Sequence, residues 1–568
     1  MITRRDFAQA AIATAILAGS SRAIAQAAAQ QSITQNDLLR FDPLGQITLL
    51  HFTDLHAQLA PIYFREPSVN IGVGSDAGLP PHLTGETLLT AFGIPPKTAE
   101  AYALSSDDFL ALAKSYGQLG GLDRMATLIK AIRAERPTQT ILLDGGDTWQ
   151  GSYTSLKERG ADMVAAQNLL GVEAMTAHWE FTYGEARVKE LKAKLNFPFL
   201  CGNVKDATWG DRVFDGTKMF ERNGLQIAVI GQAFPYTPIS NPRYLIPDWS
   251  FGIEEDRVRS EVEAARKAGA DLVVLLSHNG FDVDRKMAAQ IQGIDVILTG
   301  HTHDAIPRSV MVGKTILTAP GSHGKFLGRL DLDIKNKAVI GHRFRLIPIF
   351  TDAIAPDPEM KALIAKIRAP YDADLNRVLA RTDSLLYRRG NFNGTFDDLI
   401  CQALLKERDA QISLSPGFRW GASLLPGQDI RLEDLYNQTA ITYPAAYRSK
   451  MTGAALKGIF EDVADNLFNP DPYYQQGGDM VRVGGMSYAI DVKKPIGSRI
   501  SDMRLANGTP IDATTNYVVA GWASVNQGTE GPPIYDVVES YLTHQKVVSV
   551  PERQTVRVTG ADPRGIAS

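Results

Sequence analysis

Short apolar runs rich in β-branched residues alternate with amphipathic stretches from about residue 46 to residue 350. The apolar runs cover residues 47–52, 140–143, 227–230, 272–276 and 296–298. Between them lie stretches of helical periodicity such as 123–136, which ends before Pro137, and 254–268. Strands that alternate with helices are typical of layered α/β domains. We therefore expect an α/β domain over this part of the chain.

Two regions depart from that regularity. Residues 60–118 are rich in Pro, Gly and Ser and form a long insertion directly after the first expected strand; connections of this length are usually functional or disordered. Residues 356–381 are charged and amphipathic, which predicts a linker helix. Residues 382–568 are richer in Gly, Asn and Tyr, with an expected helix over 397–408, and we predict a separate α+β domain there.

The N-terminus has the three parts of an export signal. Arg4 and Arg5 precede a short apolar stretch over 8–19, and Ala23-Ile24-Ala25 offers small residues for cleavage. We predict a cleavable signal peptide over residues 1–25 rather than a short buried helix. The paired arginines resemble a twin-arginine (Tat) signal, which implies a periplasmic protein that is exported already folded.

Composition narrows the possible partners and metal ligands. The chain has 568 residues, 44% of them hydrophobic, and a net charge of −4, so we expect neither a nucleic-acid partner nor a membrane surface. No apolar run is long enough to span a bilayer. Cys201 and Cys401 are far apart, which favours two separate buried thiols over a disulfide. Because the spacings of thiolate metal sites are absent, any metal must be held by His, Asp, Asn or Glu.

Candidate metal ligands follow the apolar runs. Residues two apart in an extended chain face the same side, so Asp54 and His56 can converge, as can His301 and His303. Ligands of open α/β sheets gather outside the carboxyl ends of the strands. The set that we predict to hold metal is Asp54, His56, Asp147, His178, His278, His301 and His303. Imidazole with carboxylate suits Mn, Zn or Fe, and the ligand type leaves these three open.

The order of these pieces resembles the calcineurin-like metallophosphoesterases, and within them the 5′-nucleotidase family of exported two-domain enzymes. The resemblance implies a β-sandwich flanked by helices over 26–355 and a substrate-binding domain over 382–568. It also implies two metals that share Asp147, one with Asp54, His56 and His303, the other with His178, His278 and His301. Two such cations about 4 Å apart would lower the pKa of a water to near neutrality.

One segment departs from the nucleotidase pattern. The family motif G-N-H-E-F-D-Y-G stands here as residues 177–184, with His178 at the ligand position and Trp179 at the position of the histidine that assists the leaving group. Indole has one N–H donor and neither accepts nor releases a catalytic proton. An alkoxide leaving group benefits from a general acid, whereas a thiolate or persulfide does not need one. We take Asp147, His178 and Trp179 as the candidate catalytic residues.

The C-terminal region departs as well. Nucleotidases stack the base between two aromatic rings, but residues 476–485 and 528–534, where we expect those rings, contain none. Guanidinium groups bind tetrahedral oxyanions well. The predicted substrate-binding residues are Arg389, Asn391, Arg419, Asp479 and Arg482.

Together, the His178-Trp179 pair, the 475–485 segment, the twin-arginine signal and the 60–118 insertion resemble the SoxB branch of the family, the thiosulfohydrolases of periplasmic sulfur oxidation. The resemblance implies that a cysteine S-thiosulfonate on the carrier protein SoxYZ is hydrolysed to sulfate and a carrier persulfide, with two Mn²⁺ ions. The carrier arm would reach the metals through a channel between the domains, which residues 60–118 and 475–485 are candidates to line. Two alternatives stay open: a periplasmic 5′-nucleotidase or phosphodiesterase, and a metal-binding protein without turnover.

Overall fold

The first predicted strand lies at the centre of a five-stranded sheet. The computed structural model describes residues 33–567, so the predicted signal peptide over 1–25 lies outside the described residues. All six side chains of β1 (Ile47–Phe52) are buried. The strand order is β15-β14-β1-β4-β5, and β1 runs parallel to β4 and antiparallel to β14. The other strands are β4 (Thr140–Asp144), β5 (Ala174–Met175), β14 (Phe326–Lys335) and β15 (Ala338–Pro348).

A second sheet of six strands has the order β12-β13-β11-β10-β8-β7. Its central strand β10 (Leu272–Ser277) runs parallel to β8 and to β11. The remaining strands are β7 (Thr217–Arg222), β8 (Leu225–Gln232), β11 (Val296–Thr299), β12 (Val310–Val312) and β13 (Thr315–Thr318).

The two sheets pack face to face. Leu49 and Ile141 of the first sheet share one buried cluster with Val229 and Val274 of the second. Helices α7 (Leu122–Glu135) and α9 (Ala161–Leu170) pack on the outer face of the first sheet. Helices α12 (Glu255–Lys267) and α13 (Phe281–Gln290) pack on the outer face of the second. The central strands of both sheets are largely apolar because both of their faces are covered. The predicted fold class, a β-sandwich flanked by helices, is confirmed.

The insertion over 60–118 is more regular than its composition suggests. It holds β2 (Pro61–Ile62) and three short helices, α4 (Gly85–Phe92), α5 (Ala99–Leu104) and α6 (Phe109–Tyr116), before β3 (Leu119–Gly120). Tyr102 and Phe109 are buried in the cluster on the outer face of the first sheet. Burial of these aromatic rings gives the helices the tertiary contacts that short helices require.

The helix predicted over 356–381 is shorter than expected. Helix α14 (Pro358–Arg368) begins at the N-cap Asp357, whose carboxylate accepts the Met360 N–H. It ends beside Pro370, a residue that cannot continue the hydrogen-bond ladder. A short turn, α15 (Asp372–Leu375) and the strand β16 (Val378–Thr382) follow. Pro370 interrupts the helix, but the chain stays helical to Leu375. The prediction was wrong for the residues that follow, which form β16.

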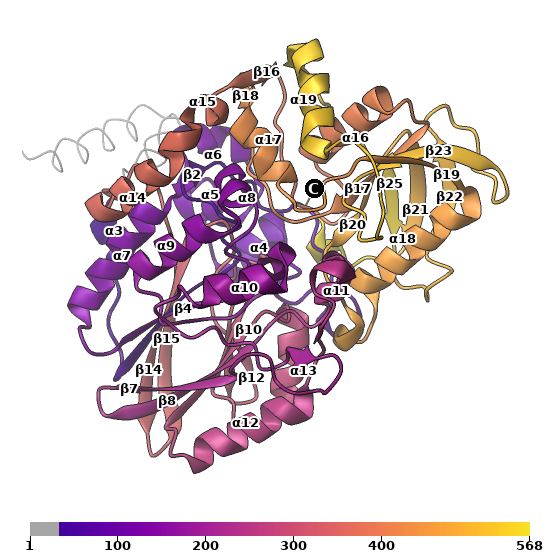
Figure 1. Cartoon of the computed structure of the whole chain (residues 1–568). Coiled ribbons are helices and arrows are strands. Elements are labelled where there is room, and N and C mark those ends of the chain that lie inside the picture. The colour runs from indigo at the N-terminus through magenta and orange to yellow at the C-terminus, as the bar shows by residue number, and fades with distance from the viewer. Residues whose placement is uncertain (1–32, 568) are drawn as a thin grey trace, which may run out of the picture.

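The C-terminal half is an α+β assembly that lies beside the sandwich (Figure 1). Its largest sheet has the order β19-β23-β17-β20, formed by β17 (Ile412–Gly417), β19 (Tyr447–Thr452), β20 (Asp479–Gly484) and β23 (Asn516–Gly521). Its helices are α16 (Thr395–Glu407), α17 (Leu432–Thr439), α18 (Gly453–Phe468) and α19 (Ile534–Gln545). Two smaller sheets contain β18 (Asp429–Arg431), β21 (Met486–Asp491), β22 (Ile500–Leu505), β24 (Val547–Val548) and β25 (Val556–Thr559).

The two halves are joined through the insertion. The Ser423 N–H donates to the Tyr63 carbonyl at 2.7 Å, and the Ala567 N–H donates to the Ser68 carbonyl at 2.7 Å. The Ile71 N–H donates to Asn391 Oδ1, also at 2.7 Å. Residues 60–71 therefore bind the C-terminal half directly and hold it next to the sandwich.

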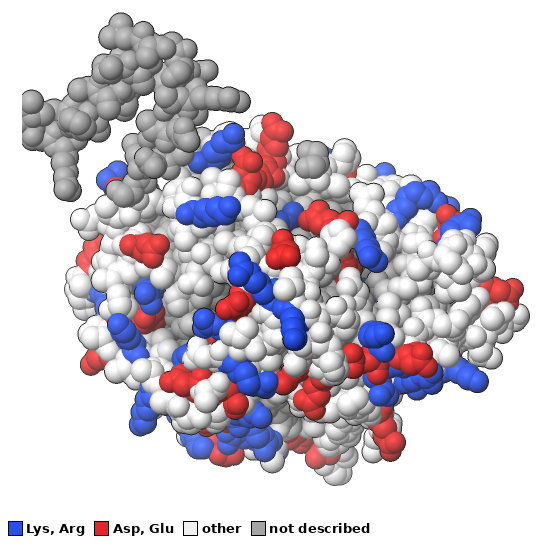
Figure 2. Space-filling view, turned by 90° about the horizontal axis from the view of Figure 1, so that it is seen from above, with Lys and Arg blue, Asp and Glu red and all other residues white. Residues whose placement is uncertain are grey.

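The face shown in Figure 2 carries charges of both signs, and the two thiols are separate. Figure 2 shows basic and acidic side chains interspersed over the face that it presents. Among residues 33–567, no helix is long and apolar enough to cross a bilayer. Both Cys201 and Cys401 are free and buried.

Candidate metal centre

The candidate ligands gather at one edge of the sandwich. Strands β1, β4 and β5 run parallel in one sheet, and β8, β10 and β11 run parallel in the other. Their carboxyl ends therefore lie at the same edge, where the loops that follow them meet. All seven predicted ligands are on these loops.

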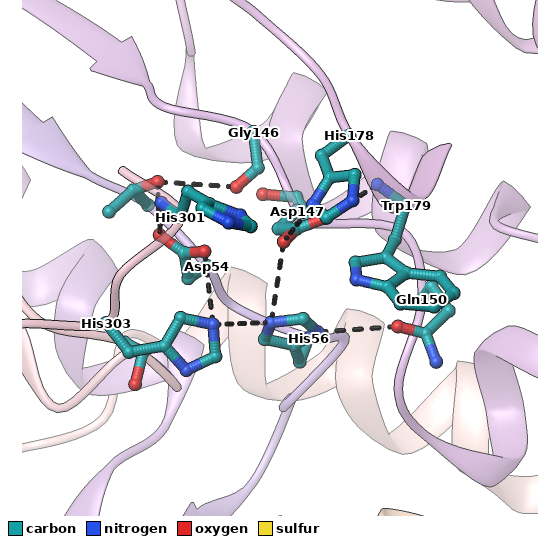
Figure 3. A network of polar contacts seen from close by, with 12 residues as sticks. Asp54, His56, Gly146, Asp147, Gln150, His178, Trp179, His301 and His303 are labelled. Atoms are coloured by element: carbon teal, nitrogen blue, oxygen red, sulfur yellow. Dashed lines mark hydrogen bonds and ion pairs between the residues drawn. The ribbon is translucent and has the colours of Figure 1, made fainter. Parts of the chain in front are cut away.

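These side chains form two buried groups that share one carboxylate (Figure 3). Within each group the ligand atoms lie within 4.8 Å of one another. One group consists of Asp54, His56, Asp147 and His303, and the other of Asp147, His178, His278 and His301. The structure thus brings together the two sets that the family resemblance implies.

The ligand nitrogens converge on the two carboxylates. Asp147 Oδ2 lies 3.1 Å from His178 Nδ1, 3.1 Å from His278 Nε2 and 3.7 Å from His56 Nε2. Asp54 Oδ1 lies 3.2 Å from His303 Nε2. His56 Nε2 and His303 Nε2 are only 3.0 Å apart. Ligands placed about 2.0–2.2 Å from one cation have separations of this order.

The backbone is strained where the ligands sit. Asp54, His56, Asp147, His301 and His303 all have positive φ, between 46° and 75°. Residues with a Cβ rarely adopt this left-handed conformation, and each costs about 1–2 kcal/mol. Strain of this kind persists where the surrounding structure imposes it and clusters at functional sites. The loops consequently aim five of the seven ligands at one point at the expense of local backbone energy.

A layer of hydrogen bonds orients the ligands. The His278 ring donates from Nδ1 to the Gly145 carbonyl at 2.6 Å, so its Nε2 faces Asp147. His56 Nδ1 faces the amide oxygen Oε1 of Gln150 at 3.4 Å, which leaves its Nε2 for a metal. The backbone N–H of Trp179 donates to Asp147 Oδ1 at 2.7 Å and holds the shared carboxylate in place.

Glu180 and Asp144 hold the loops that carry Asp147 and His178. The Glu180 carboxylate accepts the N–H groups of Thr148 and His178, and burial raises its pKa to about 6. Asp144 accepts from the Gly146 N–H and the Thr148 hydroxyl without contacting a ligand. Asp144 is therefore a turn-stabilising residue.

Burial sets the protonation of the imidazoles. It lowers the pKa of His56 and His178 and holds the pKa of His301 and His303 well below the usual range. Burial also lowers the pKa of His278, but Asp147 and Asp54 outweigh it and raise that pKa to about 10. Four imidazoles are thus neutral and ready to bind a cation, and the proton on His278 would leave when a metal binds.

Unpaired buried atoms show that these residues fit metal ions. Asp54 Oδ1 and both ring nitrogens of His301, one of which would bind a metal, are buried without a hydrogen-bond partner within residues 33–567. A buried polar atom without a partner is costly, and coordination relieves that cost. The donor set of carboxylates and imidazoles without thiolate suits a pair of divalent transition metals, and the ligand chemistry leaves their identity open.

Four predicted substrate-binding residues lie beside the ligands. Arg389, Asn391, Arg419 and Asp479 line a polar cavity that reaches His301. Asp479 organises them, because its Oδ1 accepts from Asn391 Nδ2 at 3.2 Å and from Arg419 Nε at 3.4 Å. Burial raises the pKa of Asp479, but the neighbouring arginines outweigh it and hold the pKa below its usual value. Arg419 Nη1 has no partner among residues 33–567 and is a free donor for an oxyanion.

Arg482 does not join them. The sequence predicts it as a substrate contact, but its side chain lies in the interior and pairs with Asp397 at 3.2 Å and with Asp479 at 3.1 Å. It lies on β20, the edge strand of this sheet, opposite Ser415 of β17. The structure therefore places Arg482 behind Asp479 as a structural cation.

The two arginines are expected to respond differently to replacement. Arg482→Met removes the buried cation that Asp397 and Asp479 share and leaves each with one arginine, Arg388 and Arg419 respectively. It should lower the free energy of unfolding by about 3 kcal/mol. Arg419→Met leaves stability close to that of the wild type and should reduce kcat/KM about 10²-fold, since it removes one donor to a developing oxyanion. Thermal unfolding and steady-state kinetics of both variants check this. Equal stability of the two variants would contradict the assignment.

Sequence reasoning missed several residues around the centre. Phe234 stacks on His301 with ring centroids 4.0 Å apart, and Ser240 Oγ lies 3.0 Å from His178 Nε2. Both follow β8, whose apolar run was recognised without its strand-end residues. Phe418 and Trp420 also line the cavity above the ligands, with Trp420 stacked on His56 at 5.5 Å. Only the positions of the C-terminal loops bring these two rings to the site.

Comparison with known proteins places this centre in a family. The family model of the 5′-nucleotidase C-terminal domain matches residues 378–539. The 5′-nucleotidase of Bos taurus is 25% identical over 426 residues, which cover 67% of this chain and 72% of that protein. The structure of the sulfate thiohydrolase SoxB from Thermus thermophilus is 37% identical with a TM-score of 0.88, covering 92% of this chain and 98% of that one. A 5′-nucleotidase precursor structure from the same organism, 21% identical with a TM-score of 0.72, shares the fold over 90% of this chain and 99% of that one.

Family members are metal-dependent hydrolases, and the two buried groups fit a dinuclear site of that kind. The similarity to SoxB extends over both halves of the chain. The chain therefore belongs to the 5′-nucleotidase family of calcineurin-like metallophosphoesterases, within its SoxB branch.

Proposed function

We propose that this protein is a dimanganese thiosulfohydrolase, which releases sulfate from a cysteine S-thiosulfonate on the carrier protein SoxYZ during thiosulfate oxidation. In this reaction hydroxide attacks the terminal sulfonate sulfur and forms an S–O bond. The S–S bond breaks, and both of its electrons go to the persulfide sulfur that stays on the carrier. The products are sulfate and the carrier persulfide, so no external oxidant or reductant is required.

The observation that carries this proposal is the set of side chains around Trp179, where we propose that the leaving group departs. Figure 3 shows the Trp179 indole beside His56 and Asp147, with its ring nitrogen on the side of the ligands. Phe418 and Trp420 meet its ring edge-on, at centroid distances of 5.3 and 4.9 Å. An indole N–H can donate a hydrogen bond but cannot protonate an alkoxide. A persulfide anion leaves without a proton, because its conjugate acid is far stronger than an alcohol.

The residues divide the work between two sides of the centre. When bound, two divalent cations would supply Lewis acidity and a water of lowered pKa. Asp147 accepts the backbone N–H of Trp179 on one oxygen and faces His178 and His278 with the other. On the polar side, Arg389 and Arg419 are positioned to bind the sulfonate oxygens, whose negative charge grows during the attack.

Export and partner belong to the same proposal. The twin-arginine motif over residues 4–5 supports export of the folded protein to the periplasm. The insertion and the 475–479 loop both line cavities beside the ligands, where they are suited to admit a flexible cysteine arm of SoxYZ.

The test compares two substrate classes on the same preparation. Purified Mn²⁺-loaded protein is given thiosulfonated SoxYZ and, in parallel, nucleoside monophosphates, and sulfate and phosphate release are measured. We expect sulfate release at a kcat/KM at least about 10³-fold above that for phosphate release, since alkoxide departure has no general acid here. Predominant phosphate release would instead support a 5′-nucleotidase, which the C-terminal family match favours. Release of neither product would support a binding protein.

A further inference from the structure

Two cavities adjoin above the metal ligands, and we term them the polar half and the apolar half of the site. Arg419, Gly477, Asp479 and His301 line both halves. The polar half continues to Arg389 and Asn391. The apolar half is lined mainly by large hydrocarbon and aromatic side chains: Trp179, Phe234, Ile239, Phe418, Trp420, Tyr443 and Val525.

Three rings form one face of the apolar half. We term these rings, Trp179, Phe418 and Trp420, the aromatic wall. Phe418 and Trp420 stack almost parallel, with centroids 4.0 Å apart and an angle of 18° between the rings. Trp420 also stacks on the ligand His56, and Trp522 meets Phe418 edge-on from behind. Mutual packing of this kind leaves the rings little rotational freedom. The wall is consequently a rigid surface next to the ligands.

One polar group in the wall lacks a partner. Trp420 is 2% exposed, and its indole N–H has no acceptor among residues 33–567. Trp522 in the same cluster donates its indole N–H to Ser415 Oγ at 2.8 Å, and Trp149 donates to Gln167 Oε1 at 2.8 Å. Buried indole N–H groups usually have an acceptor, so the free one on Trp420 is available to a bound group.

We infer that Phe418 and Trp420 determine specificity by selecting a sulfur leaving group over an oxygen one. This inference rests on the proposed function. Polarisable sulfur packs favourably on aromatic rings. Negative charge that develops on a leaving sulfur can accept from the Trp420 N–H without taking its proton. An alkoxide gains neither the sulfur contact nor the proton that it needs. The arginines on the polar half then orient the charged end of the substrate, and the wall receives its sulfur end.

The test measures binding separately from turnover. Isothermal titration calorimetry on the full Mn²⁺-loaded chain, with sulfate present on the arginine side, compares diethyl disulfide with diethyl ether and with adenosine. We expect the wild type to bind the disulfide at least about tenfold more tightly than the ether. Phe418→Leu and Trp420→Leu should each weaken disulfide binding about threefold to tenfold, the fold-change that corresponds to one sulfur–aromatic contact, and leave ether binding unchanged.

Two further variants control for folding and for nonspecific loss. Trp420→Phe keeps a ring in the wall and should retain most of the disulfide preference. Trp209→Leu replaces a tryptophan that is 80% exposed on a distant loop and should behave as the wild type. Retention of two metals per chain shows that a variant keeps the site. Unchanged disulfide affinity in both Phe418→Leu and Trp420→Leu, or tighter binding of adenosine than of disulfide by the wild type, would overturn the inference.

Sulfate release from thiosulfonated carrier is measured on the same variants. If the wild type releases no sulfate but the leucine variants still lose the disulfide preference, the proposed function is wrong and the inference about the aromatic wall stands. If all variants release sulfate with the wild-type kcat/KM and bind disulfide equally, the wall fails and the function is retained.

Discussion

Asp147→Ala is expected to remove metal from both positions and to abolish turnover. Asp147 is the one carboxylate that both ligand groups contain, and its Oδ2 lies 3.1 Å from His178 Nδ1 and from His278 Nε2. Without it, neutral imidazoles converge with no charge to hold a second cation. Because metal catalysis contributes several kcal/mol to the barrier, we expect kcat/KM to fall at least about 10³-fold. Elemental analysis should show fewer than one metal per chain, compared with two in the wild type.

The matched control is Asp357→Ala, which removes a buried carboxylate of the same kind far from the ligands. Asp357 caps α14 by accepting the Met360 N–H at 3.0 Å. This variant should keep two metals and lose about 1 kcal/mol of stability, the typical value of an N-cap. Full turnover by Asp147→Ala, or active wild-type protein without bound transition metal, would refute the assignment of the centre.

Gly477→Ala is expected to have the second-largest effect. The 475–479 loop passes so close to the centre that a Cβ on Gly477 would lie 2.1 Å from His301 Nε2. The backbone φ of +79° also disfavours any side chain there. Either the loop or the His301 ring has to move, which disturbs the group formed by Asp147, His178, His278 and His301. We expect this group to bind its metal about 10–100-fold more weakly and kcat/KM to fall by a similar factor, as when groups that orient a ligand are altered.

Gly508→Ala separates the collision from the backbone strain. Gly508 has nearly the same φ, +85°, but a Cβ there would meet nothing within 4 Å. This variant should lose about 1–2 kcal/mol of stability and bind both metals as the wild type does. Metal titration of the two glycine variants checks the difference. If Gly477→Ala binds two metals with wild-type affinity, the loop does not constrain His301.

Much of the catalytic half could be predicted from its sequence because its strands are continuous apolar runs. The runs at 47–52 and 272–276 are apolar throughout, as strands covered on both faces must be, and each is followed by ligand-type residues. Since parallel strands end at one edge, the gathering of the ligands follows from their positions after the strands, whereas their division into two groups was implied by the family resemblance. The same reasoning extended to β8 would have identified Phe234.

The C-terminal contribution to the site could not be read in this way. Arg419 and Arg482 look alike in sequence, yet one reaches the cavity and the other pairs with Asp397 of α16 in the interior. The rings expected at 476–485 and 528–534 are absent from those segments, but Phe418 and Trp420 supply aromatic surface from a different loop. No local periodicity shows which of these side chains reach the cavity, because that depends on how the C-terminal sheet packs beside the sandwich.

The sequence alone determined the order of strands and helices, the donor atoms and the absence of thiolate ligands. These properties follow from the types of the residues and their spacing along the chain. Tertiary structure alone decided which backbone loops are bent into the left-handed region, which arginine faces the cavity, and how close Gly477 approaches His301. The physical reason is that these properties arise from contacts between residues far apart in the sequence. Such contacts form only when the chain has folded and its parts pack together.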